Sequence, residues 1–124
     1  MQPPSLGDDD LARLRVALDE ERTRLRSQLA GLERTFEDLV AGADVEPADD
    51  EHDPDGTTAY ERAQITSLAR ITRARLAEVD AAIDATIDTT GRPGFGTCER
   101  CAAPIGVERM LARPGTTRCV RCAG

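Results

Sequence analysis

Apolar residues recur at a helical spacing in residues 8–41. The repeated positions are Leu11, Leu18, Leu25, Leu29, Leu32, Phe36 and Leu39. Steps of three, four and seven residues are typical of a heptad seam, and Arg15 and Arg22 take two of its core positions. The three aspartates at 8–10 suit the first turn of a helix, because carboxylates stabilise the positive end of the helix dipole. We predict a helix over residues 8–41, with Gly42 at the position where glycine commonly ends a helix.

A second apolar stripe of the same period follows in residues 58–90. Its members are Ile65, Ala69, Thr72, Leu76, Val79, Ile83 and Thr86, with Leu68 and Ile87 beside them. Thr58 and Glu61 form a capping box, which typically begins a helix, and Gly91 and Pro93 are expected to end it. Residues 43–57 hold two Pro, one Gly and a block of acids, so we predict a loop there.

Two helices of similar length, each with one apolar stripe, predict an antiparallel helical hairpin. Each arm of about 30 residues would be roughly 45 Å long. The alternative is a compact bundle, which would require oligomerisation because the sequence offers no third long helix. The scarcity of aromatic residues, 2% of the chain, favours the hairpin, because large aromatic side chains dominate the filling of globular cores.

Charge and cysteine content divide the chain of 124 residues further. The net charge is -7, and residues 44–55 carry seven acids and no Arg or Lys, whereas residues 92–124 carry six Arg, two Glu and all four Cys. We predict two domains, a helical hairpin over residues 1–91 with an acidic tip loop at about 43–57, and a small domain over residues 92–124. No stretch is apolar enough to span a membrane and the N-terminus lacks the features of a signal peptide, so a cytoplasmic protein is expected.

The four cysteines form two CxxC pairs, Cys98 with Cys101 and Cys119 with Cys122, separated by 17 residues. This spacing is typical of a tetrahedral four-cysteine zinc site, in which each turn supplies two thiolates. A region this small needs a metal to fold, and four thiolates leave no open coordination position, so one structural zinc ion is expected. Gly96 would permit a tight approach before the first pair, Ile105, Met110 and Leu111 would form a small apolar cap, and residues 107–112 would form a short helix.

Other readings of the cysteines are less well supported by the sequence. A redox CxxC of the thioredoxin type would need a βαβ context, which is absent, and a catalytic zinc site usually includes histidine. The single histidine, His52, lies in the acidic loop. The chain also has no P-loop and no GxSxG motif, so we do not expect an enzyme.

From about residue 10 onward, the sequence resembles the DksA/TraR zinc-finger proteins of bacteria. The resemblance rests on Phe95-Gly96-Thr97-Cys98-x-x-Cys101-x17-Cys119-x-x-Cys122, on the segment from Pro104 to Pro114 with its Ala-Arg-Pro ending, and on the predicted hairpin with an acidic tip. The segments Asp50-Glu51-His52-Asp53-Pro54-Asp55-Gly56 and Tyr60-Glu61-Arg62-Ala63-Gln64 are nearest to actinobacterial-type members. The resemblance implies a mainly α fold, a long antiparallel helical hairpin (coiled coil) followed by a small four-cysteine zinc finger.

The resemblance also implies a function. Members of this family regulate transcription by binding RNA polymerase directly, with the hairpin in the secondary channel and acidic tip residues near the active centre. Here the tip candidates are Asp50, Asp53 and Asp55. The family's tip pattern, Asp-x-x-Asp-x-Ala, is only partly kept, because Asp53 is followed by Pro54 and Asp55.

Some family members also bind the alarmone ppGpp jointly with the polymerase. The resemblance makes Arg113 a candidate contact for ppGpp or polymerase. Two positions where relatives carry Lys are Ala82 and Ala123 in this chain. These two differences argue against a ppGpp response.

Two rival functions remain compatible with the residues themselves. One is a nucleic-acid-binding zinc ribbon on a coiled-coil stalk, although the overall acidic charge opposes it, since a duplex binder presents a large basic surface. Direct sequence-specific binding to DNA is therefore not expected. The other is an interaction protein that works without polymerase and oligomerises through its hairpin.

Overall fold

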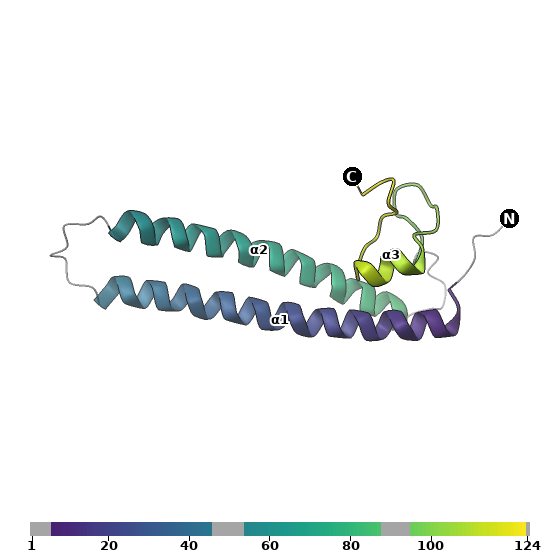
Figure 1. Cartoon of the computed structure of the whole chain (residues 1–124), viewed down its shortest axis with the longest axis horizontal. Coiled ribbons are helices and arrows are strands. Elements are labelled where there is room, and N and C mark those ends of the chain that lie inside the picture. Colours follow the sequence, from purple (N-terminus) through teal and green to yellow (C-terminus); the bar gives the residue numbers. More distant parts are fainter. Residues whose placement is uncertain (1–5, 46–53, 88–94, 124) are drawn as a thin grey trace. The chain divides into compact units, whose positions relative to one another are not determined.

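The computed structural model describes residues 6–45, 54–87 and 95–123. Within these residues the chain forms three helices, α1 (Asp8–Val45), α2 (Pro54–Ile87) and α3 (Val107–Ala112), as Figure 1 shows. One isolated antiparallel bridge joins Thr97 to Pro104, and the described segments contain no β-strand. The prediction of a mainly α protein with two long helices before a small cysteine-containing region is confirmed.

The tip-side ends of the two long helices differ from the sequence prediction. α1 continues through Gly42 to Val45, because an interior glycine weakens a helix by only about 1 kcal/mol and does not oblige it to stop. α2 begins at Pro54, so Thr58 and Glu61 lie inside the helix rather than at its cap. Proline suits the first helical position because its missing N–H would have no partner there. Residues 46–53 of the expected loop lie outside the described residues.

The start of α1 and the span of α3 agree with the sequence prediction. α1 starts at Asp8 with all three aspartates in its first turn, as predicted, and the Leu11 amide donates to the Gly7 carbonyl at 2.9 Å. α3 covers Val107–Ala112, the predicted short helix. The expected stop signals Gly91 and Pro93 lie outside the described residues.

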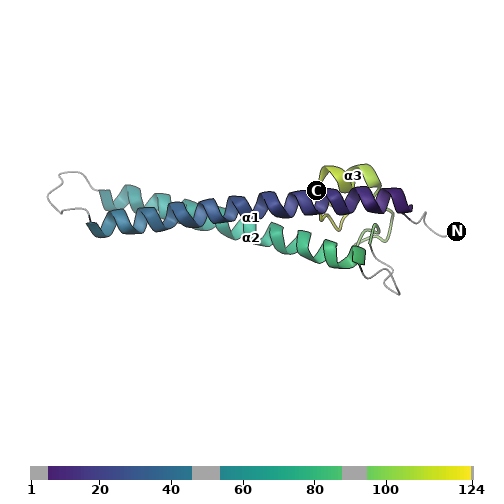
Figure 2. The ribbon, with the colours of Figure 1, turned by 90° about the horizontal axis from the view of Figure 1, so that it is seen from below.

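The chain forms two compact units, each built from parts of both long helices. The base unit, our name for the first, comprises Met1–Arg24 and Arg75–Gly124, and the hairpin unit comprises Leu25–Ala74. Within each unit the stretch of α1 runs antiparallel to the stretch of α2 (Figures 1 and 2). The zinc-finger region therefore packs in one unit with the start of α1 and the end of α2.

In the hairpin unit the seam of predicted apolar positions holds the helices together. Leu25, Ala69 and Thr72 are buried, and Thr72 donates its hydroxyl to the Leu68 carbonyl at 2.8 Å, which lets a polar side chain occupy the seam. Further along the seam, the predicted apolar residues are only half-buried: Leu29, Leu32, Phe36, Leu39 and Ile65. An exposed ion pair between Arg73 and Glu33 at 3.3 Å links the two helices.

In the base unit the seam is buried at Leu18, Val79 and Thr86 and half-buried at Leu11, Leu76 and Ile83. The two Arg residues assigned to it do not occupy core positions. Leu14 is buried at 1% exposure, whereas Arg15, placed in the seam by heptad counting, is exposed. Arg15 instead donates to the Thr86 carbonyl at 2.6 Å, near the C-terminal end of α2. Arg22, the other basic residue assigned to a core position, is half-buried and pairs with Asp19 at 2.9 Å and with Asp80 at 4.0 Å. A guanidinium group keeps hydrogen bonds and partial solvation at the edge of the seam, which a core position would deny it.

Candidate metal centre

Two tight turns present the four cysteines. In the first turn the Cys98 amide donates to the Ala103 carbonyl at 2.8 Å, and the Ala102 amide donates back to the Cys98 carbonyl at 2.9 Å. In the second turn the amides of Cys122 and Ala123 both donate to the Cys119 carbonyl at 3.1 Å. These bonds fold each CxxC segment so that its two sulfurs lie on one side.

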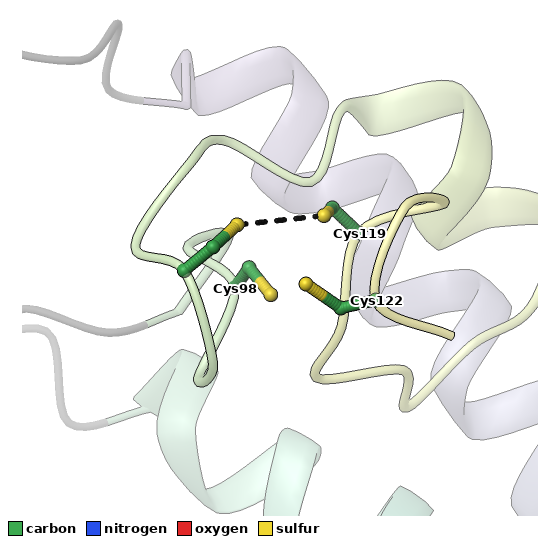
Figure 3. Close-up of side chains that lie close together, drawn as sticks. Cys98, Cys119 and Cys122 are labelled. Atoms are coloured by element: carbon green, nitrogen blue, oxygen red, sulfur yellow. Dashed lines mark hydrogen bonds between the residues drawn. The ribbon is translucent and has the colours of Figure 1, made fainter. Parts of the chain in front are cut away.

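The four sulfurs of Cys98, Cys101, Cys119 and Cys122 lie within 4.8 Å of one another. Figure 3 shows the sulfurs of Cys98, Cys119 and Cys122 pointing toward a common centre. Tetrahedral zinc at about 2.3 Å from each sulfur requires sulfur separations of about 3.8 Å. The Cys101 and Cys119 sulfurs are 3.6 Å apart, so the cluster fits one zinc ion. Four thiolates complete a tetrahedral shell, which is the arrangement of a structural site.

The surroundings of the thiols affect their protonation unequally. A hydrogen bond from the Cys119 backbone is the main cause that lowers the pKa of Cys98 to about 6, although burial opposes it. Burial raises the pKa of Cys122 to about 12, and the neighbouring Cys119 thiol adds to this effect. A metal-free site would therefore keep the Cys122 proton at neutral pH, and zinc must displace it.

The apolar support beneath the metal site comes partly from α1. The buried cluster contains Leu14, Cys98, Ile105, Met110 and Cys119, with Leu6, Phe95, Leu111 and Cys122 packed against it. The predicted cap of Ile105, Met110 and Leu111 is therefore confirmed. Leu6, Leu14 and Phe95 were not predicted as part of this cap, and the only sequence signal for Leu14 is its spacing of three residues from Leu11 and four from Leu18.

Two glycines permit close approaches that hold the finger in place. Gly96 has φ +91°, and a Cβ atom there would lie 3.2 Å from the Leu6 Cδ1 atom, which agrees with the predicted tight approach. Gly115 has φ +92°, and a Cβ atom there would lie 3.3 Å from the Val79 Cγ2 atom and 3.4 Å from the Val79 backbone. The finger thus contacts α2 at Gly115, where a Cβ atom would be crowded and the positive φ also favours glycine.

Arg113 lies at the C-terminal end of α3, exposed at the rim of a hollow of about 270 Å³. The other lining residues are Glu78, Glu99, Arg109, Thr116, Thr117, Arg118 and Ala123. Arg109 donates to the Arg118 carbonyl at 2.9 Å, and Arg118 donates to Glu99 at 3.1 Å, an interaction that lowers the pKa of Glu99. Sequence reasoning missed Arg109 and Arg118. The spacing of four residues between Arg109 and Arg113 was the signal available.

The tip candidates are placed only in part. Asp50 and Asp53 lie outside the described residues, and Asp55 lies in the first turn of α2. Their proposed role therefore stays a prediction.

Comparison with known proteins agrees with the metal site and the fold. Residues 93–124 match the prokaryotic dksA/traR C4-type zinc finger. The fold is similar to the solved structure of transcription factor DksA2 from Pseudomonas aeruginosa, with a TM-score of 0.73 and 22% sequence identity over 92% of this chain and 80% of that chain. None of the curated proteins matches the chain. Among the described helices, none has both the length and the apolar character to cross a membrane.

Proposed function

We propose that the chain acts as a DksA/TraR-family protein and regulates transcription by binding RNA polymerase directly. The observation that carries this proposal is the four-cysteine site, whose geometry fits one zinc ion and whose sequence matches the dksA/traR finger. The similar fold of a transcription factor over most of the chain supports the same role. In this role zinc stabilises the finger and takes no part in a reaction.

The proposed mode of action is insertion of the helical hairpin into the secondary channel of the polymerase. Two uninterrupted helices of 38 and 34 residues support it, because each is roughly 50 Å or more in length at about 1.5 Å per residue. A pair of helices is narrow enough for a channel that a globular domain could not enter. The finger would stay outside and fix the depth of insertion.

The proposed effectors are acidic residues between the two helices. Residues 44–55 carry seven acids without Arg or Lys, and Asp50, Asp53 and Asp55 are the candidates within this run. Close to the catalytic Mg²⁺ ions, such carboxylates would act in a medium of low dielectric constant, where charge interactions are much stronger than in water. Their effect would be to change the lifetime of open promoter complexes.

The test replaces the tip acids without removing their volume. In the triple variant Asp50→Asn, Asp53→Asn and Asp55→Asn we expect polymerase binding to persist while the effect on open-complex lifetime is lost. A matched control neutralises three exposed acids on the helices, Glu20→Gln, Asp38→Asn and Asp84→Asn, and should act as the unmodified protein does. An unchanged effect of the tip variant on transcription would refute the role of these acids.

Arg113 is a further candidate contact, for the polymerase or for ppGpp. Support comes from the hollow beside it, where Arg109 and Arg118 add positive charge. Ala123 lines the same hollow at a position where ppGpp-responsive relatives carry Lys, so we expect little or no response to ppGpp. Transcription measured with and without ppGpp, for the unmodified protein and for Arg113→Ala, tests both parts of this expectation.

A further inference from the structure

α2 carries exposed apolar side chains on a different face from the seam that packs against α1. Five large apolar side chains are exposed in the part of the chain that the structure describes, and three of them, Tyr60, Leu68 and Ile71, belong to α2 within the hairpin unit. They are 66%, 48% and 65% exposed. Single exposed apolar residues are ordinary on a protein surface, but a group of them close together indicates a contact surface.

The spacing of these residues gathers them on one face of the helix. Tyr60, Ala63, Ser67 and Ile71 recur at steps of three and four residues, and Leu68 lies one turn before Ile71. Residues at this spacing are neighbours on a helix surface, and all five are exposed. Ala63 and Ser67 are small, which lets a second helix approach closely between the larger side chains. We call these five residues the outer stripe.

The charges beside the outer stripe favour a second copy of α2 as its partner, in the opposite direction. Glu61 lies near the start of the stripe, whereas residues 63–74 contain two Arg and no acid. Glu61 and Arg70 are exposed, and neither forms an ion pair with another described residue. In an antiparallel pair, the acidic end of each stripe meets the basic end of the other. A parallel pair would oppose like charges, which suppresses association.

The acidic run at 44–55 does not oppose this arrangement. The run precedes the outer stripe in each copy, so antiparallel packing directs the two runs toward opposite ends of the paired helices. The paired segment itself, residues 60–74, contains one acid and three Arg, so its net charge is small. Repulsion between the two copies is therefore limited along the stripe.

The size of the outer stripe limits the strength of the contact. Three large and two small side chains cover less than the roughly 800 Å² that each partner buries in a standard protein interface. The expected complex therefore forms and dissociates with protein concentration. It differs in this respect from a permanent dimer, whose interface is larger and more apolar.

We propose that the outer stripe is the interface of a reversible, antiparallel homodimer, in which Tyr60 of one copy packs near Ile71 of the other. A two-fold axis near the middle of the stripe makes the interface isologous, so both copies contribute the same residues. Formation of this dimer does not depend on the proposed function. If the hairpin enters the polymerase channel as proposed, the dimer is a reserve form that must dissociate first.

The first test places a charge in the outer stripe. Self-association of the zinc-bound protein is measured by sedimentation equilibrium over a series of concentrations. Ile71→Glu should weaken it by about tenfold or more, because the symmetry brings two uncompensated carboxylates into an apolar contact. Val16→Glu is the matched control, since Val16 is 58% exposed on α1, and it should change the association constant by less than about twofold. Circular dichroism checks that both variants stay folded.

The second test reverses charges at the two ends of the stripe. Glu61→Arg should weaken the dimer by about threefold at low salt, because antiparallel packing would then oppose basic groups at both ends. Combining Glu61→Arg with Arg70→Glu exchanges the charges of the two ends and should restore most of the association. In a parallel pair the single variant would only replace one repulsion between like charges by another.

Each outcome decides a specific part of the proposal. Weakening by Ile71→Glu but not by Val16→Glu, together with recovery in the charge-exchange variant, supports the antiparallel dimer. A protein that stays monomeric at every concentration refutes it. A dimer that Ile71→Glu leaves intact, or that Val16→Glu weakens equally, refutes the outer stripe as its interface, and a dimer unaffected by Glu61→Arg refutes the antiparallel order. No polymerase enters these measurements, so their failure is distinct from failure of the proposed function.

Discussion

The packing of Leu14 gives the sharpest prediction about stability. Leu14 belongs to α1, yet it is 1% exposed within the cluster that includes Cys98, Ile105 and Met110 of the finger. Leu14→Ala therefore removes a side chain that the start of α1 and the finger share. We expect the variant to destabilise the base unit as a whole rather than one helix end.

The size of the effect follows from the burial of this side chain. Leu→Ala at a buried site costs about 2–5 kcal/mol, depending on how far the cavity collapses. A value of about 3 kcal/mol would be a large part of the roughly 5–15 kcal/mol that stabilises an ordinary domain. For a chain of this size it corresponds to a decrease in Tm of roughly 10 °C.

The assay is thermal unfolding followed by circular dichroism, with zinc in excess and after chelation. Val16→Ala is the matched control, because Val16 lies on the same helix and is 58% exposed, and it should change the stability by less than about 0.5 kcal/mol. Leu14→Ala and chelation should be less than additive, since both disrupt the same core. Full additivity, or a Leu14→Ala variant as stable as the control, would refute the shared core.

Three further predictions concern the base unit. Gly115→Ala should destabilise the protein more than Gly106→Ala in denaturant titrations. Both glycines have positive φ, but only a Cβ atom at 115 would crowd the α2 backbone. Equal losses of stability in the two variants would argue against the close approach. Arg15→Ala should cost about 1–2 kcal/mol in the same assay, through loss of the hydrogen bond to the end of α2. Zinc affinity, measured by competition with a chelating indicator, should rise with pH because zinc displaces the Cys122 proton. Below about pH 6 the affinity should fall more steeply with decreasing pH, because Cys98 also becomes protonated. An affinity independent of pH would contradict this prediction.

The sequence predicted best the features that depend on local pattern. The acidic first turn of α1, the seam of α2 and the span of α3 all follow from spacing and residue type, and the structure agrees with each. The cysteine spacing likewise predicted a four-sulfur cluster, because ligand geometry restricts the turns that can form it.

The features that sequence reasoning missed depend on contacts between distant segments. Leu14 is buried because the finger, more than 80 residues later, packs over it, and heptad counting alone placed Arg15 there instead. The helix ends near the tip were also mispredicted, since glycine and capping motifs change helix stability by only about 1 kcal/mol and can be overridden.

Insertion of the hairpin into RNA polymerase is tested most directly by a crosslinking map of the tip. A photo-activatable amino acid replaces His52 within the acidic run, and a second protein carries it at Val120, an exposed position in the finger. If the hairpin enters the secondary channel, the tip probe should crosslink to polymerase segments lining that channel and the active centre, and the finger probe should crosslink outside them. Tip crosslinks confined to the outer surface of a polymerase that binds the protein would contradict insertion of the hairpin, and no crosslink from either position would contradict the proposed partnership itself.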